Sequence, residues 1–159
     1  MTVTVGPAGP QDVPEISRLL RDYLTATETE KAAHGLAVPG PLPSRYQHEI
    51  DRPEELLAGT LLARDGRTTL GLVVLEVQHD QAEIRRLWVD PAARGTGAGR
   101  ALVRAALERA GGRRVSLTVW DWRSAPIALY RSLGFVGQDS WDERERLLCM
   151  AFQPDQSTR

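Results

Sequence analysis

The stretch AEIRRLWVDPAARGTGAGRALV, residues 82–103, decides the fold, because a strand, a glycine turn and a helix follow one another in it. Apolar and charged residues share positions 82–89, as in a strand, and Pro91 ends it because proline cannot donate to a ladder. After the turn, apolar residues return at the spacing of one helix face until Gly111. They are Leu102, Val103, Ala106, Leu107 and Ala110.

The turn RGTGAG, Arg94 to Gly99, has the chemistry of an anion site. Glycines let the backbone approach a ligand, and the first N–H groups of the following helix have no internal partner. The P-loop signature fails because Arg100 and Ala101 stand where Lys and Ser or Thr are required. The dinucleotide fingerprint fails because Arg100 replaces its third glycine. The residues alone leave two interpretations, a phosphate cradle or a plain turn.

Around this stretch the sequence predicts one mixed α/β domain over residues 1–159. Before it we expect a short strand at Val3–Val5, a helix capped by Asp12 and running to Leu24, and an irregular segment from Thr25 to Ser44. A short helix interrupted near Pro53 follows. Two strands joined by an Asp-Gly turn then complete an antiparallel meander with residues 82–89; they are 60–64 and 69–77.

After the glycine turn and its helix, residues 115–119 form an apolar strand. A strand connected through a helix is expected to lie parallel to the strand before it. A helix over 125–133 ends at Gly134, and a last hairpin uses Phe135-Val136 and residues 146–152. We expect the tail, 153–159, to be disordered.

Net charge, cysteine and histidine content and hydropathy argue against several classes of protein. A net charge of −1 over 159 residues does not favour a nucleic-acid partner. Cys149 is the only cysteine, so no internal disulfide is expected, and the three histidines lack partners at metal-ligand spacing. The sequence shows neither a signal peptide nor an apolar run of membrane-spanning length. We therefore expect a cytoplasmic protein without a metal and without a membrane partner.

A second motif, APIALYRSLGF at residues 125–135, follows the glycine turn at a distance. Together the two stretches resemble the GNAT superfamily of acyl-CoA-dependent N-acyltransferases, and the likeness covers roughly residues 3–152. It implies a mostly antiparallel central sheet of about six to seven strands, helices on both faces and a splay between the fourth and fifth strands. It also implies transfer of an acetyl group from acetyl-CoA directly to a primary amine of a small molecule or peptide.

The resemblance also assigns residues to the cofactor. It places the pyrophosphate on backbone N–H groups of Gly95, Thr96, Gly97, Ala98, Gly99 and Arg100, with Arg94 adding charge. Main-chain groups of Leu87, Trp88 and Val89 would bond the pantetheine arm. Arg123 stands where many relatives have asparagine; there we expect it to reach a phosphate or a substrate carboxylate, while Ser124 caps the next helix.

Tyr130 is the expected acid, since relatives place a tyrosine beside the cofactor sulfur and a phenol can protonate a thiolate. The alternative is a tyrosine that only packs. The resemblance also makes Glu83 the expected base, since several relatives carry a carboxylate at this position; by simple alternation it shares a strand face with Arg85, Leu87 and Val89. A surface ion pair and a water chain are its alternatives, and Glu76 and Asp121 are reserve candidates.

The acceptor site is left open by the sequence. Tyr23, Tyr46, Trp120 and Trp122 form either an apolar or cation-holding wall or part of the core. Glu28 and Glu30 would suit a polyamine, whereas Arg85 and Arg123 would suit an acidic amino acid. The rival functions are a non-catalytic acyl-CoA-binding or sensing module and a nucleotide-phosphate enzyme. A homodimer is also considered, since the exposed last strand allows pairing between subunits.

Overall fold

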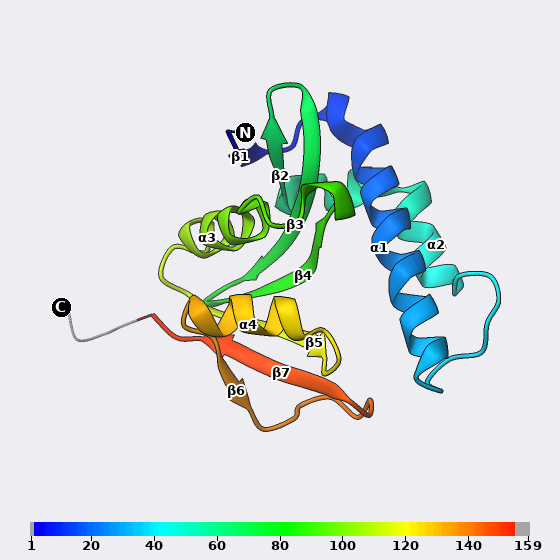
Figure 1. The fold of residues 1–159 in the computed structure, drawn as a ribbon. Coiled ribbons are helices and arrows are strands. Elements are labelled where there is room, and N and C mark those ends of the chain that lie inside the picture. The colour runs from blue at the N-terminus through cyan, green and yellow to red at the C-terminus, as the bar shows by residue number, and fades with distance from the viewer. Residues whose placement is uncertain (1, 155–159) are drawn as a thin grey trace.

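The computed structural model describes residues 2–154 and contains one seven-stranded sheet (Figure 1). The strand order is β1-β2-β3-β4-β5-β7-β6. Every neighbouring pair is antiparallel except β4 and β5, which confirms the predicted mixed sheet. The strands are β1 Thr4–Pro7, β2 Thr60–Asp65, β3 Thr68–Gln78, β4 Gln81–Val89, β5 Arg114–Trp120, β6 Val136–Gln138 and β7 Leu147–Phe152.

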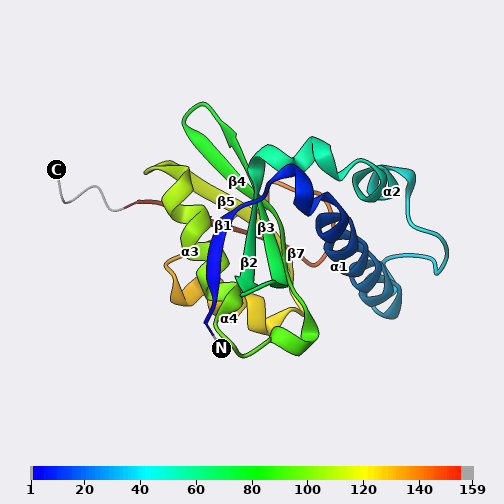
Figure 2. The ribbon, with the colours of Figure 1, turned by 90° about the horizontal axis from the view of Figure 1, so that it is seen from above.

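Helices cover both faces of the sheet (Figure 2). On one face lie α1, Val13–Ala33, and α2, Ser44–Asp51; on the other lie α3, Ala98–Ala110, and α4, Ser124–Ser132. Short 3-10 turns, η1 Pro10–Asp12, η2 Pro53–Gly59 and η3 Pro91–Ala93, connect them. None of the helices within residues 2–154 combines the length and apolarity that crossing a bilayer requires.

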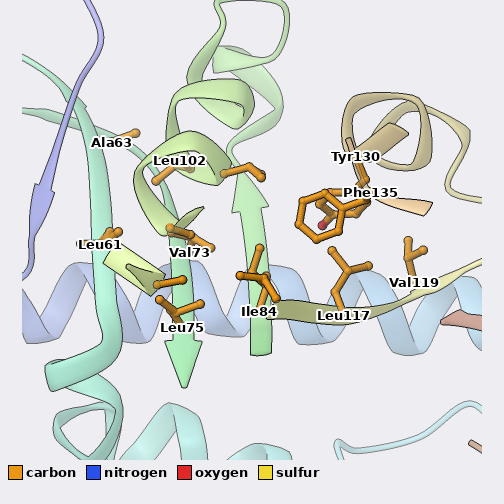
Figure 3. Close-up of a cluster of buried hydrophobic side chains, with 14 of the residues drawn as sticks. Leu61, Ala63, Val73, Leu75, Ile84, Leu102, Leu117, Val119, Tyr130 and Phe135 are labelled. Carbon is orange, nitrogen blue, oxygen red and sulfur yellow. The ribbon is translucent and has the colours of Figure 1, made fainter. Parts of the chain in front are cut away.

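Each face of the sheet buries its own apolar cluster, because alternate residues of a strand point to opposite faces. In β2, Leu61 and Ala63 join the cluster under α3 and α4, whereas Leu62 joins the one under α1 and α2. Figure 3 shows the larger cluster, in which Leu102 of α3 lies toward Val73, and Tyr130 of α4 lies near Phe135 and Leu117. Burial on both faces fixes the register of the strands.

Helix α1 is longer than predicted. The irregular segment expected from Thr25 is wrong up to Ala33, because no helix breaker occurs before Gly35, which has a φ of +74°. Leu20, Leu24 and Thr27 are buried at helical spacing and continue the apolar face. As a result, the last turns of α1 extend along the sheet, where they contribute side chains to the functional site.

The remaining elements match the prediction to within a few residues. Asp12 is the N-cap residue of α1 but makes no capping bond; its carboxylate accepts instead from the Gly9 amide at 2.8 Å. Gly111 ends α3 in the left-handed conformation. Gln153 and Pro154 follow β7 without regular structure, and the rest of the predicted tail, 155–159, lies outside the described residues.

Candidate functional site

Strands β4 and β5 separate along most of their length. They pair in parallel only from Gln81 to Glu83, opposite Arg114 to Ser116, although β4 continues to Val89 and β5 to Trp120. Beyond Glu83 the backbone of β4 has no ladder partner on its β5 side among the described residues. This confirms the predicted splay between the fourth and fifth strands, and it leaves main-chain groups of β4 available to a ligand.

A β-bulge in β4 changes which side chains share a face. Val74 of β3 pairs with Arg86 and Leu75 with Ile84, so Arg85 is the extra residue. Leu87 and Val89 therefore pack with Ile84 in the cluster under α3, while Trp88 packs in the cluster under α1 and α2. The predicted alternation that placed Glu83 on the face of Leu87 and Val89 is wrong, because the bulge reverses the phase between them.

Two cavities meet at the gap between the strands. The first, of about 450 Å³, lies at the glycine turn and is called the loop cavity. The second, of about 590 Å³, lies between α1, α2, β4, β5 and the segment before β7, and is called the charged cavity. Leu87, Arg123 and Pro126 line both of them. A ligand that enters along the glycine turn therefore reaches the charged cavity at the splay.

Most of the residues predicted to bind a cofactor line the loop cavity. They are Leu87, Trp88, Val89, Arg94, Gly95, Gly97, Ala98, Gly99, Arg100 and Arg123. The Thr96 hydroxyl is turned away and donates to the Ala93 carbonyl at 2.5 Å. Ser124 does not line the loop cavity, and its predicted capping role is wrong, because it is the first residue of α4 and makes no cap hydrogen bond.

The glycine turn is shaped as an open cradle. Gly95 and Gly97 have φ values of +81° and +89°, a conformation that favours glycine, and a Cβ added to either would meet no atom within 4 Å. No backbone carbonyl of the described residues accepts from the amides of Ala98, Gly99 or Arg100, the first turn of α3. The Arg94 guanidinium lies 4.8 Å from the centre of the Trp88 ring. The cradle therefore offers N–H donors, a helix dipole and positive charge to an anion.

Arg123 is held by α1. Its Nε and Nη2 donate to the Glu30 carboxylate at 3.0 and 3.2 Å, and Nη2 also donates to the Thr27 hydroxyl at 2.7 Å. Trp122 donates to the same carboxylate at 2.6 Å. Arg123 thus ties the start of α4 to α1 at the junction of the two cavities, instead of standing free for a phosphate.

Tyr130 is buried, with 5% of its surface exposed, and its ring packs against Phe135 at 5.5 Å between centres. It lines the charged cavity, and its hydroxyl makes no hydrogen bond within the described residues. Burial raises the pKa of this phenol well above its usual range, and a weaker contribution from Arg123 opposes the shift. The group therefore stays protonated and available as a donor at the cavity wall.

Glu83 also lines the charged cavity, and its side chain is 47% exposed. Its carboxylate lies 3.9 Å from Arg85 Nε, at the limit of an ion pair. Arg85 is more closely paired with Glu76, at 2.8 Å, which leaves Glu83 only loosely held. Asp121, the other reserve candidate, is paired with Arg146 at 2.9 Å.

Sequence reasoning missed Thr27 as a site residue and considered Glu30 only for a polyamine, not as the partner of Arg123, because it ended α1 too early. The signal was present: Leu20, Leu24, Thr27 and Lys31 continue the helical spacing without a glycine or proline. Of the expected aromatic wall, Tyr23, Tyr46 and Trp120 line the charged cavity, while Trp122 stacks on His34 at 4.1 Å. Over residues 2–154, no group of three or more His, Cys, Asp or Glu side chains is arranged to hold a metal.

Comparisons with known proteins identify the family. The sequence matches the acetyltransferase (GNAT) family over residues 16–135, which is most of the chain. The chain belongs to this family. The match contains most of α1, the splayed strands, the glycine turn and Tyr130, so it covers the loop cavity and most of the charged cavity.

Individual relatives match only part of the chain. The N-alpha-acetyltransferase RimI of Mycobacterium tuberculosis is 35% identical over 97 residues, which cover 58% of this chain and 60% of that protein. An uncharacterised protein of Mycobacterium leprae is 40% identical over 78 residues, only 21% of its length. The chain therefore spans less than two thirds of either relative.

Solved structures share the fold. The ribosomal-protein-S18-alanine N-acetyltransferase from Escherichia coli superposes with a TM-score of 0.70 at 19% identity, over 99% of each chain. The PaiA N-acetyltransferase from Thermoplasma acidophilum, in complex with coenzyme A, gives 0.71 at 18% identity, over 96% of this chain and 99% of that one. At identities this low, the superpositions show a shared fold and nothing beyond it.

The tie between Glu30 and Arg123 predicts a pH-dependent loss of stability on mutation. Burial alone would raise the pKa of the Glu30 carboxyl, but hydrogen bonds from Arg123 and Trp122 and the charges of Arg123 and Arg94 outweigh it and lower the pKa below 4.5. The resulting stabilisation is complete above the unfolded-state pKa and is lost as pH falls through the folded-state value. Glu30→Gln should lower the free energy of unfolding by about 1 kcal/mol near pH 7.

Urea unfolding of both proteins near pH 7 and near pH 3.5 measures this difference, which should shrink at the lower pH. Glu108→Gln, the same change at an exposed position of α3, is the matched control and should be close to neutral at both. A deficit of Glu30→Gln that is equal at the two pH values would contradict the tie.

Proposed function

We propose that the protein is an acetyl-CoA-dependent N-acetyltransferase that transfers the acetyl group directly to a primary amine. One observation carries the proposal: the glycine cradle and the cavity that holds Tyr130 and Glu83 meet at the gap between β4 and β5. The name of the RimI relative and the coenzyme A bound by PaiA support the same donor and chemistry. The names of RimI and of the Escherichia coli neighbour favour a peptide α-amine as acceptor, with a small-molecule amine as the alternative.

The loop cavity fits coenzyme A. Its pyrophosphate would lie on the amides of Ala98, Gly99 and Arg100, where the open glycines leave room and the helix dipole favours negative charge. The pantetheine arm is an extended chain with amide groups, so it suits the unpaired edge of Leu87 to Val89, much as a peptide adds to a sheet edge. Acetyl-CoA would supply a thioester whose carbonyl carbon is open to attack by an amine.

Proton transfers from the amine and to the sulfur then fall to residues of this chain. Most of an alkyl amine is protonated at pH 7, so a base must remove a proton before attack. Glu83, loosely held at the cavity wall, takes this proton directly or through a water. Tyr130, kept protonated by burial, donates its phenolic proton to the departing sulfur, and the second proton lost by the attacking nitrogen returns to the tyrosinate. The bulged strand and α4 thereby place acid and base on the walls of one cavity.

Substitution of Gly97 tests whether the glycine cradle binds the pyrophosphate. Gly97→Glu should weaken acetyl-CoA binding by about 100-fold or more, because it places an anion and a side chain where the pyrophosphate would lie. Gly66→Glu is the matched control: Gly66 also has a positive φ, +59°, and open space, but lies in the turn between β2 and β3. Calorimetric titration of both variants measures the effect, and equal affinities would contradict the cradle.

Removal of the Tyr130 hydroxyl tests its role as the acid. Tyr130→Phe keeps the ring packed but removes the proton donor, so kcat should fall about 10²- to 10⁴-fold while the Kd for acetyl-CoA changes little. Release of the coenzyme A thiol, measured with a panel of peptide and small-molecule amines, gives kcat. Unchanged turnover would remove Tyr130 from the mechanism. Binding of acetyl-CoA by the wild-type protein without turnover of any amine would instead support a non-catalytic binding module.

Neutralisation of Glu83 tests its role as the base. Glu83→Gln should lower kcat/KM most at neutral pH, and the deficit should shrink as pH approaches the pKa of the amine, because a neutral amine needs no base. Glu108→Gln is the control: Glu108 is exposed on α3 and does not line the charged cavity. A deficit of Glu83→Gln that is constant with pH would assign proton removal to a water chain without Glu83.

A further inference from the structure

The walls of the charged cavity carry an excess of positive charge. Six cationic side chains line it, against four carboxylates. The carboxylates are Glu28, Glu49, Glu83 and Asp142, and the cations are Lys31, Arg45, Arg85, Arg86, Arg123 and Arg144. The positive charge can attract a ligand only where a cationic side chain has no carboxylate partner. The ion pairs of the six cations therefore determine which ligand the cavity attracts.

Five of the six cations are already paired with a carboxylate. Within residues 2–154, Lys31 pairs with Glu28 at 2.9 Å, Arg85 with Glu76 at 2.8 Å, Arg86 with Glu49 at 2.8 Å, Arg123 with Glu30 at 3.0 Å and Arg144 with Asp142 at 2.8 Å. Arg85 and Arg123, the two residues that the sequence suggested for an acidic acceptor, are therefore committed to the protein itself. The sixth cation, Arg45, makes no ion pair with any described residue.

Arg45 is exposed at the edge of the cavity, in the first turn of α2. Its Nη2 donates to the Tyr46 hydroxyl at 3.0 Å, which leaves most of its N–H groups unused. Glu49, one helical turn further on, is no substitute partner, because Arg86 donates to its two carboxylate oxygens at 3.2 and 2.8 Å.

The position of Arg45 is also unfavourable for its own helix. The first turn of a helix carries partial positive charge, which an acidic residue would stabilise, and α2 has none there. Two aromatic contacts keep positive charge together at this point: the guanidiniums of Arg45 and Arg86 lie 4.7 and 5.9 Å from the Tyr46 ring. The α2 side of the cavity is thus its unneutralised positive end.

Around Glu83 the balance of charge is negative. Glu83 and Glu76 face one another across β3 and β4 and share Arg85, which leaves one net negative charge where the amine is to be deprotonated. The cavity is therefore negative near Glu83 and positive near Arg45. A ligand with an amine at one end and an anion at the other complements both.

We propose that the acceptor is a peptide with a free N-terminal amine and an acidic side chain close to it, and that Arg45 binds this carboxylate. The inference rests on the proposed function, since it specifies the acceptor of the same reaction. The volume of about 590 Å³ favours a peptide over a single amino acid, because pockets of about 300–1,000 Å³ hold drug-sized ligands. Arg45 is a specificity residue in this account and takes no part in proton transfer.

The test compares two peptides that differ only in charge, Ala-Glu-Ala-Ala amide and Ala-Gln-Ala-Ala amide, with free glutamate as a third acceptor. The wild-type protein should show a kcat/KM about tenfold higher for the glutamate-containing peptide, mainly through KM, because charged hydrogen bonds are the stronger ones. Raised salt should reduce this ratio, since the site is partly exposed. Free glutamate should be the poorer substrate.

Arg45→Gln should bring the ratio of the two peptides close to one, and Arg45→Glu should invert it. Arg67→Gln, the same change at an exposed arginine in the turn between β2 and β3, should keep the wild-type ratio. Equal use of both peptides by the wild-type protein, or a preference that persists in Arg45→Gln, would overturn the inference and leave the proposed function intact. Free glutamate as the better substrate would overturn the peptide assignment. Failure to turn over any amine would overturn the proposed function itself.

Discussion

The short parallel pairing of β4 with β5 is the constraint on which the rest of the site depends. Three residues of each strand pair, and then the strands separate around side chains from α4, among them Tyr130 (Figure 3). A fully paired sheet would satisfy every backbone group of β4 and leave no opening between the faces. The separation creates an unpaired strand edge and joins the loop cavity to the charged cavity at Leu87, Arg123 and Pro126.

The two cavities use different chemistry for different tasks. The loop cavity relies on backbone amides, glycine conformations and the dipole of α3, which suit a phosphate and depend little on side-chain identity. The charged cavity relies on side chains from α1, α2, β4 and the segment before β7, whose mutual ion pairs decide which charges remain for a ligand. The proposed acceptor therefore depends on side chains that the phosphate site does not use.

Local signals made much of this structure predictable. Pro91, the glycines of the turn and the apolar stripe of α3 act within a few residues, and each was identified correctly from the sequence. Three features depended on more distant partners. The bulge at Arg85 reversed the face of Glu83, and the length of α1 brought Glu30 to Arg123. Among the described residues, Arg45 is the one cation lining the charged cavity that has no ion pair, which depends on the partners of the other five. These three features involve segments whose proximity the residue spacing did not indicate.

The central claim is that coenzyme A binds in the gap, with its phosphates on the first turn of α3 and its arm along β4. Amide chemical shifts of the isotope-labelled protein, followed by NMR during titration with coenzyme A, test this directly. The largest changes should fall on Ala98, Gly99 and Arg100 and on Leu87 to Val89. Changes concentrated elsewhere, or none at saturating ligand, would contradict it.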